Sequence, residues 1–393
     1  MSSSPLPVAP LAEAAAPAEA PSPPPATAAV APCPISADFL PPNMRKYVDP
    51  QGPVPLRMMA AKALVPLSPS DMVAVLFMLS FDLAETVRQA AAGTLFALPD
   101  RILSPSLRDE ALKPPVLGHC LQVFAGNEEY VQTLTLNGST PDEAVAVVAG
   151  TCSAKIAEII CQNQLRILRN DNILRKLCRN PNALVSVIDG VCDFAVRSGM
   201  LLQDVPQMQQ ARVRVFGPRA LLKPPQLGPT AEEVVNEYRE LRDDNAPPVE
   251  AGKRLTVSQR VTKMSISEKI KLATLGNREA RGLLMRDNNK LVAVAVIRSP
   301  RITDGEVLAM ANNRAIIDEV LRIIYSNREW IKNYSVKLAL AKNPKTPLAI
   351  SMRFLSTLQE SDVRALARNK NVQAGIQLMA KKMLEKKNAL PKS

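Results

Sequence analysis

The side chains most capable of chemistry in this sequence are His119 and Cys120, which are adjacent. A histidine beside a cysteine can accept the thiol proton and so produce a nucleophilic thiolate. Neighbouring residues on a helix point about 100° apart, however, so adjacent positions do not align the two groups. His119 is also the only histidine in 393 residues, which removes most histidine-based catalysis and most histidine-ligated metal sites. We therefore interpret it as a structural residue near a helix start.

Six cysteines could ligate a metal or form disulfides, and they lie at positions 33, 120, 152, 161, 178 and 192. No two of them form a CxxC pair. Spacings of 9, 17 and 14 among the last four fit neither a zinc site nor a small disulfide framework. The sequence predicts reduced thiols packed in a core, with no metal and no cofactor.

Motifs for phosphate binding and catalysis are missing from the sequence. Gly252-Lys253 is followed by Arg254, and no glycine stands five residues before Gly252, so there is no Walker A loop. GxGxxG, HExxH and GxSxG patterns are absent too. We expect a protein that is not an enzyme and has no small-molecule substrate.

The positive charge of the chain is concentrated near its C-terminal end. Residues 253–393 hold 28 Lys and Arg against 11 Asp and Glu, a balance of +17, whereas residues 1–252 have a balance of −5. Such an asymmetry favours an acidic protein surface, nucleic acid or an anionic lipid as the partner. The alternative is that these cations only solvate the outer faces of helices.

Helices are the elements expected to position these residues. Aromatic residues make up only 4% of the chain, and Ala, Leu and Met are abundant, which argues against an all-β fold. Capping boxes are predicted at Thr140–Glu143, Ser265–Glu268 and Ser326–Glu329. No apolar run reaches the ~18 residues of a membrane span. The predicted fold class is therefore all-α.

Asparagines mark the predicted helix ends. Leu134-Thr-Leu-Asn137, Leu177-Cys-Arg-Asn180 and Leu340-Ala-Lys-Asn343 follow one template, which recurs at Leu366-Ala-Arg-Asn369. We expect each Asn to adopt the left-handed backbone conformation that ends a helix. Self-similarity at spacings of 26 to 44 residues is typical of a solenoid built from helical hairpins.

Prolines divide the chain into segments. Residues 1–43 contain 12 Pro and 12 Ala and predict a disordered tail, whose early prolines interrupt any secretory signal, so we expect a cytoplasmic protein. Residues 44–202 and 255–388 each predict a helical-repeat unit, the second of them basic. Residues 203–254 predict a Pro-rich linker with a short helix near 230–242. The prolines from Pro206 to Pro229 are expected to break any helix between 203 and 229.

The junction at Leu340–Pro347 and the Asp-x-x-x-x-Val-Arg piece at Asp82–Arg88 resemble HEAT repeats and the related leucine-rich repeat variant family. The segments Glu268–Asn277 and Arg328–Asn333 resemble uncharacterised bacterial helical-repeat proteins more closely. The resemblance covers about residues 44–202 and 264–384 and implies two α-solenoid units, but no chemistry. Some leucine-rich repeat variant proteins hold an iron–sulfur centre in an N-terminal cysteine cluster; here only Cys33 lies in the tail, so that feature does not carry over.

The predicted function is a non-enzymatic scaffold or adaptor whose basic unit binds an acidic or mixed surface of a partner protein. The candidate partner-binding residues lie at or beside predicted hairpin junctions; they are Arg328, Trp330, Lys332, Lys342, Lys345, Arg353, Arg364, Arg368 and Lys370. Trp330 could anchor a peptide or stack on a base, or it could instead wedge between two hairpins.

Two other functions remain as alternatives. The same basic unit could bind nucleic acid, and phosphate contacts would then make the affinity fall steeply with salt. An enzyme resembling HEAT-like DNA glycosylases would need an acidic residue in a basic, aromatic-lined cleft. The 8 Phe, 5 Tyr and 1 Trp of the whole chain offer few residues for such a cleft.

Overall fold

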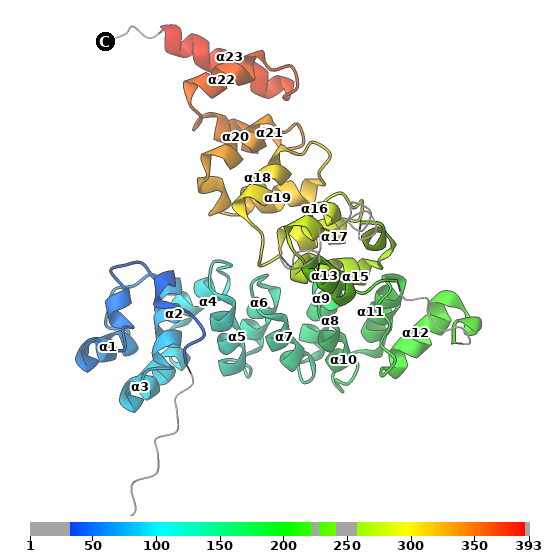
Figure 1. Cartoon of the computed structure of the whole chain (residues 1–393). Helices are drawn as coiled ribbons and strands as arrows, with labels where there is room; N and C mark the ends of the chain where they lie inside the picture. Colours follow the sequence, from blue (N-terminus) through cyan, green and yellow to red (C-terminus); the bar gives the residue numbers. More distant parts are fainter. Residues whose placement is uncertain (1–31, 222–227, 241–257, 390–393) are drawn as a thin grey trace, which may run out of the picture. The chain divides into compact units, whose positions relative to one another are not determined.

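The fold is known from a computed structural model, which describes residues 32–221, 228–240 and 258–389. Helices and the turns between them make up all of this described part, and it contains no strand (Figure 1). The prediction of an all-α fold is confirmed. Residues 1–31 of the predicted tail, and residues 222–227 and 241–257 of the predicted linker, lie outside the described residues.

The described residues divide into two compact units, one within Met1–Leu67 and Val75–Leu95 and the other within Ser68–Ala74 and Phe96–Ser393. The first unit contains η1 (Ala37–Phe39), η2 (Arg45–Tyr47), α1 (Val54–Ala61) and most of α3 (Glu85–Phe96), while α2 (Pro69–Leu79) runs from the second unit into the first. The helices of the second unit before residue 222 are α4 (Asp100–Leu107), α5 (Pro114–Val123), α6 (Glu128–Leu136), α7 (Asp142–Ala149), α8 (Ala154–Gln162), α9 (Gln164–Arg169), α10 (Asp171–Leu177), α11 (Val185–Arg197), α12 (Pro206–Phe216) and η3 (Pro218–Leu221). Those after it are α13 (Ala231–Glu240), α15 (Ile266–Leu275), α16 (Arg278–Leu284), α17 (Lys290–Ile297), α18 (Asp304–Asn312), α19 (Asp318–Ser326), η4 (Trp330–Lys332), α20 (Tyr334–Lys342), α21 (Leu348–Leu355), α22 (Glu360–Arg368) and α23 (Ala374–Ala389).

Helices of the second unit pack both on the next helix and on the helix two positions away in the chain. The pairs with this spacing include α4 with α6, α5 with α7, α6 with α8, α15 with α17, α17 with α19, α18 with α20, and α21 with α23. In α19, for example, Val320, Leu321 and Ile324 are fully buried, as the i, i+1, i+4 spacing of one helix face requires. Each helix is too short to be stable alone, so burial of such a face against its neighbours holds it in place.

Three junction asparagines are buried, and they act in a way that differs from the prediction. Among the described residues other than glycine, only Ala63 has a positive φ, so none of these asparagines is left-handed. Instead the Asn343 amide donates to the carbonyls of Ala311 (2.8 Å) and Asn313 (3.1 Å). Its Oδ1 atom accepts from the backbone N–H of Lys345. The side chain satisfies the carbonyls at the end of a neighbouring helix, and the backbone has no need of a strained conformation.

The same bonding pattern recurs at two earlier junctions. The Asn137 amide at the end of α6 donates to the carbonyls of Leu107 and Asp109, after α4. The Asn180 amide after α10 donates to the carbonyls of Ala149 and Cys152, after α7. Each asparagine therefore ties together the C-terminal ends of two helices that pack on each other.

Two predicted capping boxes are wrong, because the helices begin elsewhere. Thr140 donates to the carbonyl of Leu134 and does not cap α7. Ser326 is the last residue of α19, and the next residue, Asn327, accepts from the backbone N–H of Glu329 and Trp330.

Ser265 does cap α15 by accepting from the N–H of Glu268, but the Glu268 carboxylate accepts from the Ala231 N–H instead of closing the box. A complete box is present at Thr303–Glu306, at the start of α18.

The expectation that prolines break any helix between 203 and 229 is also wrong. Pro206 is the first residue of α12, a position where its missing N–H would have had no partner in any case. The helix then runs to Phe216 and ends at Gly217, which has a φ of 81°. Further along, α13 lies within the range expected for the short helix.

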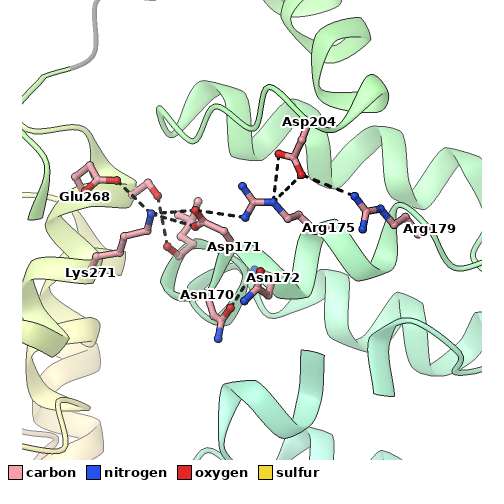
Figure 2. Close-up of polar contacts among 10 residues, drawn as sticks. Asn170, Asp171, Asn172, Arg175, Arg179, Asp204, Glu268 and Lys271 are labelled. Atoms are coloured by element: carbon pink, nitrogen blue, oxygen red, sulfur yellow. Dashed lines mark hydrogen bonds and ion pairs between the residues drawn. The ribbon is translucent and has the colours of Figure 1, made fainter. Parts of the chain in front are cut away.

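A ladder of alternating charges joins α15 to α10 in the second unit (Figure 2). It consists of Glu268, Lys271, Asp171, Arg175, Asp204 and Arg179 in that order. Lys271 Nζ lies 3.1 Å from Asp171 and 3.2 Å from Glu268, and Arg175 Nε lies 2.9 Å from Asp204. The three acids and three bases balance, so the ladder anchors α15, and with it the start of α16, without leaving an unpaired charge.

Candidate binding site

A cavity of about 240 Å³ lies between α16 and α18, in the region that the sequence identifies as basic. It is lined by Arg278, Arg281, Gly282, Met285, Arg286, Glu306, Ala309, Met310 and Asn313. The lining combines charged groups with apolar ones, the usual composition of a site that binds a ligand or a partner side chain.

The floor of the cavity is a buried ion pair between Arg281 and Glu306. Arg281 Nε and Nη2 donate to the two carboxylate oxygens at 2.8 and 2.9 Å, and Nη1 donates to the Gly276 carbonyl. Both side chains are less than 10% exposed. The bidentate geometry satisfies both groups, which makes their burial tolerable.

Local sequence places both partners of this pair. Asn277 caps α16 and so sets the position of Arg281 one turn into the helix. Glu306 is the third residue of α18, where its carboxylate also accepts from the N–H and the hydroxyl of Thr303. The capping box therefore orients the carboxylate toward Arg281.

A similar pair occurs in the first compact unit. Arg57 is buried against Asp82, 25 residues later, and donates to the carbonyl of Gly52, five residues earlier. Arg281 bonds in the same two ways, to Glu306 and to Gly276. The recurrence identifies the Arg281–Glu306 pair as a framework element that also forms the cavity floor.

The Glu306 carboxylate is charged at neutral pH. Burial raises its pKa, but the hydrogen bonds from Arg281 and Thr303 outweigh burial and hold the pKa below its ordinary value of 4.5. With three arginines and one glutamate, the lining carries a net charge of +2.

Arg278 and Arg286 supply the surplus positive charge at the rim. Both are exposed, and neither guanidinium group makes a hydrogen bond or an ion pair with any other described residue. Met285 and Met310 form apolar walls beside them. The cavity is therefore suited to an anionic group carried on an apolar stem, and not to a cation.

Gly282 and Arg286 also line a second cavity, of about 350 Å³, with Tyr238, Ser258, Glu279 and Leu283. A Cβ atom built on Gly282 would meet nothing within 4 Å. The glycine thus leaves open space on the exposed side of α16.

The cations predicted to bind a partner are distributed over the elements after α19. Arg328, Lys332, Lys345, Arg353, Arg364, Arg368 and Lys370 are exposed, and Lys342 is half-buried. Several are engaged in separate local contacts: Lys332 with Glu329, Lys345 with the carbonyl of Ile316, Arg353 with the ring of Phe354, and Arg364 with Glu360. Within the described residues, no hydrogen bond joins two of them to each other, so they share neighbouring helices and turns but do not form a cluster.

Trp330 begins η4, which packs on α19 and α20, and its side chain is half-buried. Its backbone N–H donates to Asn327. An anchor for a partner and a wedge between hairpins would both use the indole ring. A half-buried tryptophan is compatible with either role.

His119 and Cys120 both lie in α5. Burial lowers the pKa of His119 and raises the pKa of Cys120 to about 12, so this thiol is protonated at neutral pH. A protonated thiol is a poor nucleophile. Among the described residues, no group of three or more His, Cys, Asp or Glu side chains is arranged to hold a metal ion.

The cavity residues Arg278, Arg281 and Arg286 were missed by sequence reasoning, which weighted cations at hairpin junctions. A signal was present: Arg278 and Arg281 are three residues apart and therefore share a helix face. What the sequence could not show is that Glu306, 25 residues away, neutralises one arginine of this group and leaves two unpaired.

No family model, curated protein or solved structure matches this chain. In the part of the chain that the structure describes, no helix has both the length and the apolar character needed to cross a membrane. The site must therefore be interpreted from its own geometry.

Proposed function

We propose that the protein is a non-enzymatic scaffold that binds an acidic segment of a partner protein. The partner's acidic side chain enters the cavity between α16 and α18, and its apolar neighbour contacts Met285 and Met310. The cations from Arg328 to Lys370 extend the basic surface along the C-terminal helices and steer the acidic partner toward it.

The observation that carries this proposal is the cavity itself. Arg278 and Arg286 lack partners among the described residues, while the neighbouring Arg281 is fully engaged by Glu306 and Gly276. An arginine fork matches a carboxylate in a bidentate geometry, and partly enclosed apolar walls strengthen that attraction.

The proposal includes an α-solenoid arrangement related to HEAT and leucine-rich repeat variant proteins. Its support is the recurrence of the asparagine bonds at residues 137, 180 and 343 and the packing of helices two apart in sequence. Stacked hairpins of this kind offer an extended surface for a partner. The Pro/Ala-rich composition of residues 1–31 suits a disordered spacer. The predicted tail was drawn too long, because Ala37–Phe39 form η1 and Leu40 is buried.

A random-peptide display library selected on the full-length protein tests the binding mode. We expect enrichment of Asp or Glu beside an apolar residue. A selected peptide should then bind the Arg278→Gln/Arg286→Gln double variant at least about tenfold more weakly, because two charge-assisted contacts are lost.

A second variant fills the cavity without removing charge. Gly282→Leu places a side chain in the open space beside α16, so it should weaken the peptide without destabilising the fold. The matched control is Gly305→Leu, because Gly305 is also an exposed helical glycine with open space around it but does not line the cavity. Selection of peptides without an enriched acidic residue, or equal binding of a selected peptide by all variants, would overturn the proposal.

A further inference from the structure

Four of the six cysteines, Cys152, Cys161, Cys178 and Cys192, gather in the region of α8 to α11. Cys161 lies in α8, which packs on α11, the helix that carries Cys192. Within the group, the Sγ atoms of Cys178 and Cys192 are 3.7 Å apart. All the described cysteines are free thiols.

The two sulfur atoms in contact come from different helices. Cys178 is the C-cap of α10, and Gln207 donates to its carbonyl at 3.0 Å. Cys192 lies in α11 and is fully buried. A disulfide bond is about 2.05 Å long, so the sulfur atoms would have to approach by only about 1.7 Å, a distance that side-chain rotation and a small helix-end movement can supply.

The environments of the two thiols differ. Cys178 is half-buried, whereas Cys192 is fully buried. The contact with Cys178, and then burial, raise the pKa of Cys192, so Cys192 keeps its proton at neutral pH. In this arrangement Cys178 is the sulfur that a soluble oxidant meets first.

We propose that Cys178 and Cys192 form an oxidisable dithiol site that a peroxide converts to an intramolecular disulfide. The Cys178 sulfur attacks one oxygen of hydrogen peroxide and becomes a sulfenic acid; the thiol proton of Cys178 goes to the departing hydroxide, so a first water leaves. The Cys192 sulfur then attacks the Cys178 sulfur; its proton goes to the departing hydroxyl group, and water leaves. Two thiols are oxidised, and one peroxide is reduced to two molecules of water.

The other buried cysteines of the group are less suited to this step. Cys152 donates to the carbonyl of Ala149 and accepts from the Asn180 amide, so its sulfur is held in local hydrogen bonds. Burial raises the pKa of Cys161 to about 12, and Cys161 is less than 10% exposed. Only Cys178 combines access with a thiol in contact.

Oxidation of the full-length protein with hydrogen peroxide, followed by alkylation of the remaining thiols, digestion and mass spectrometry, tests the site. We expect a cross-linked peptide containing Cys178 and Cys192, with the loss of two hydrogens, that disappears after treatment with dithiothreitol. Because the bond ties α10 to α11, the urea midpoint of unfolding should rise on oxidation and return on reduction.

Cys161→Ser is the matched control, since it removes a neighbouring thiol and should leave the cross-link intact. Cys178→Ser should abolish the cross-link, and circular dichroism of this variant and of Cys178→Ala establishes that the fold persists. Cross-linking of Cys192 to Cys152 or Cys161, or no cross-link in the wild-type protein, would overturn the proposal.

Discussion

At the scale of single residues, the buried asparagines show how much one amide can do. Asn343 is only 3% exposed, yet its side chain meets three backbone groups. Asn369 follows the same Leu-Ala-x-Asn template, but it is half-buried and only accepts from the N–H of Asn371. The same residue type in the same sequence pattern therefore makes unequal contributions. At the later junction Gln373, and not Asn369, donates to the carbonyls of Pro344 and Thr346, which follow α20.

Replacing each asparagine by alanine measures this difference. Asn343→Ala leaves the buried carbonyl of Ala311 and the partly buried carbonyl of Asn313 without a side-chain donor and should lower the free energy of unfolding by about 2–3 kcal/mol. Asn369→Ala, the matched control, should cost less than about 1 kcal/mol. Urea denaturation followed by circular dichroism gives both values, and equal losses would contradict the assigned role of Asn343.

The buried carboxylate of Glu306 makes the free energy of unfolding depend on pH. Its folded-state pKa lies below the ordinary value of 4.5, so its stabilising effect is fully present above that pH and is lost as the pH falls through the folded pKa. The free energy of unfolding should therefore fall less steeply in Glu306→Gln than in the wild type between about pH 5 and pH 2. The control Glu279→Gln, at an exposed position of α16, should show the same pH dependence of unfolding as the wild type. If Glu306→Gln shows it too, the ion pair makes no net contribution to stability.

At the scale of elements, the position of α16 depends on how α15 is held. The charge ladder connects Lys271 of α15 to Asp171 of α10, and the Ser267 backbone N–H donates to the carbonyl of Ser198. Burial lowers the pKa of Lys271, but the two neighbouring carboxylates outweigh burial and raise it. Contacts between residues about 100 positions apart thus fix α15, and α15 is followed directly by α16, which lines the cavity.

Removing the central lysine tests the ladder. Lys271→Met should lower the free energy of unfolding by about 1–2 kcal/mol, because Asp171 and Glu268 lose their shared cation in a partly buried setting. Lys332→Met is the control: Lys332 pairs with Glu329 at the surface, and its loss should cost less than about 0.5 kcal/mol. Chemical denaturation distinguishes the two, and a Lys271 effect as small as the control would show that packing alone holds α15.

At the scale of the whole molecule, charge separates the region proposed to bind a partner from the rest of the chain. The balance of +17 in residues 253–393 accompanies a cavity of net charge +2 and many exposed cations. Long-range attraction of this kind accelerates the encounter with an acidic partner and is screened by salt.

Salt dependence distinguishes an acidic peptide from nucleic acid. A peptide that uses two arginine contacts should bind several-fold more weakly at about 300 mM than at about 50 mM salt, and its affinity should depend on Arg278 and Arg286. Nucleic acid that spans many cations would lose about 10³-fold or more over a similar range. Titration of the full-length protein with a selected peptide, duplex DNA and single-stranded DNA measures all three; tight DNA binding that ignores Arg278 and Arg286 would favour the alternative function.

Much of the fold could be predicted from the sequence. Helical periodicity, few aromatic residues and prolines beside polar caps determined the all-α class, since these are local properties of the chain. Some predicted helix starts were wrong, because the start of a helix also depends on contacts that are not local. Several residue types can begin a helix, and the choice between Thr140 and Pro141, or between Ser326 and Asn327, depends on which backbone groups the neighbouring helices leave unsatisfied.

The sequence by itself determined the all-helical class, the basic character of the C-terminal region and the positions of the junction asparagines. Only the tertiary structure decided which charges are free. It pairs Arg281 with Glu306 and leaves Arg278 and Arg286 open, and it brings Cys178 against Cys192. The physical reason is that helix formation depends on near neighbours in the chain, whereas ion pairing, burial and sulfur contact depend on residues that only the packing of helices brings together.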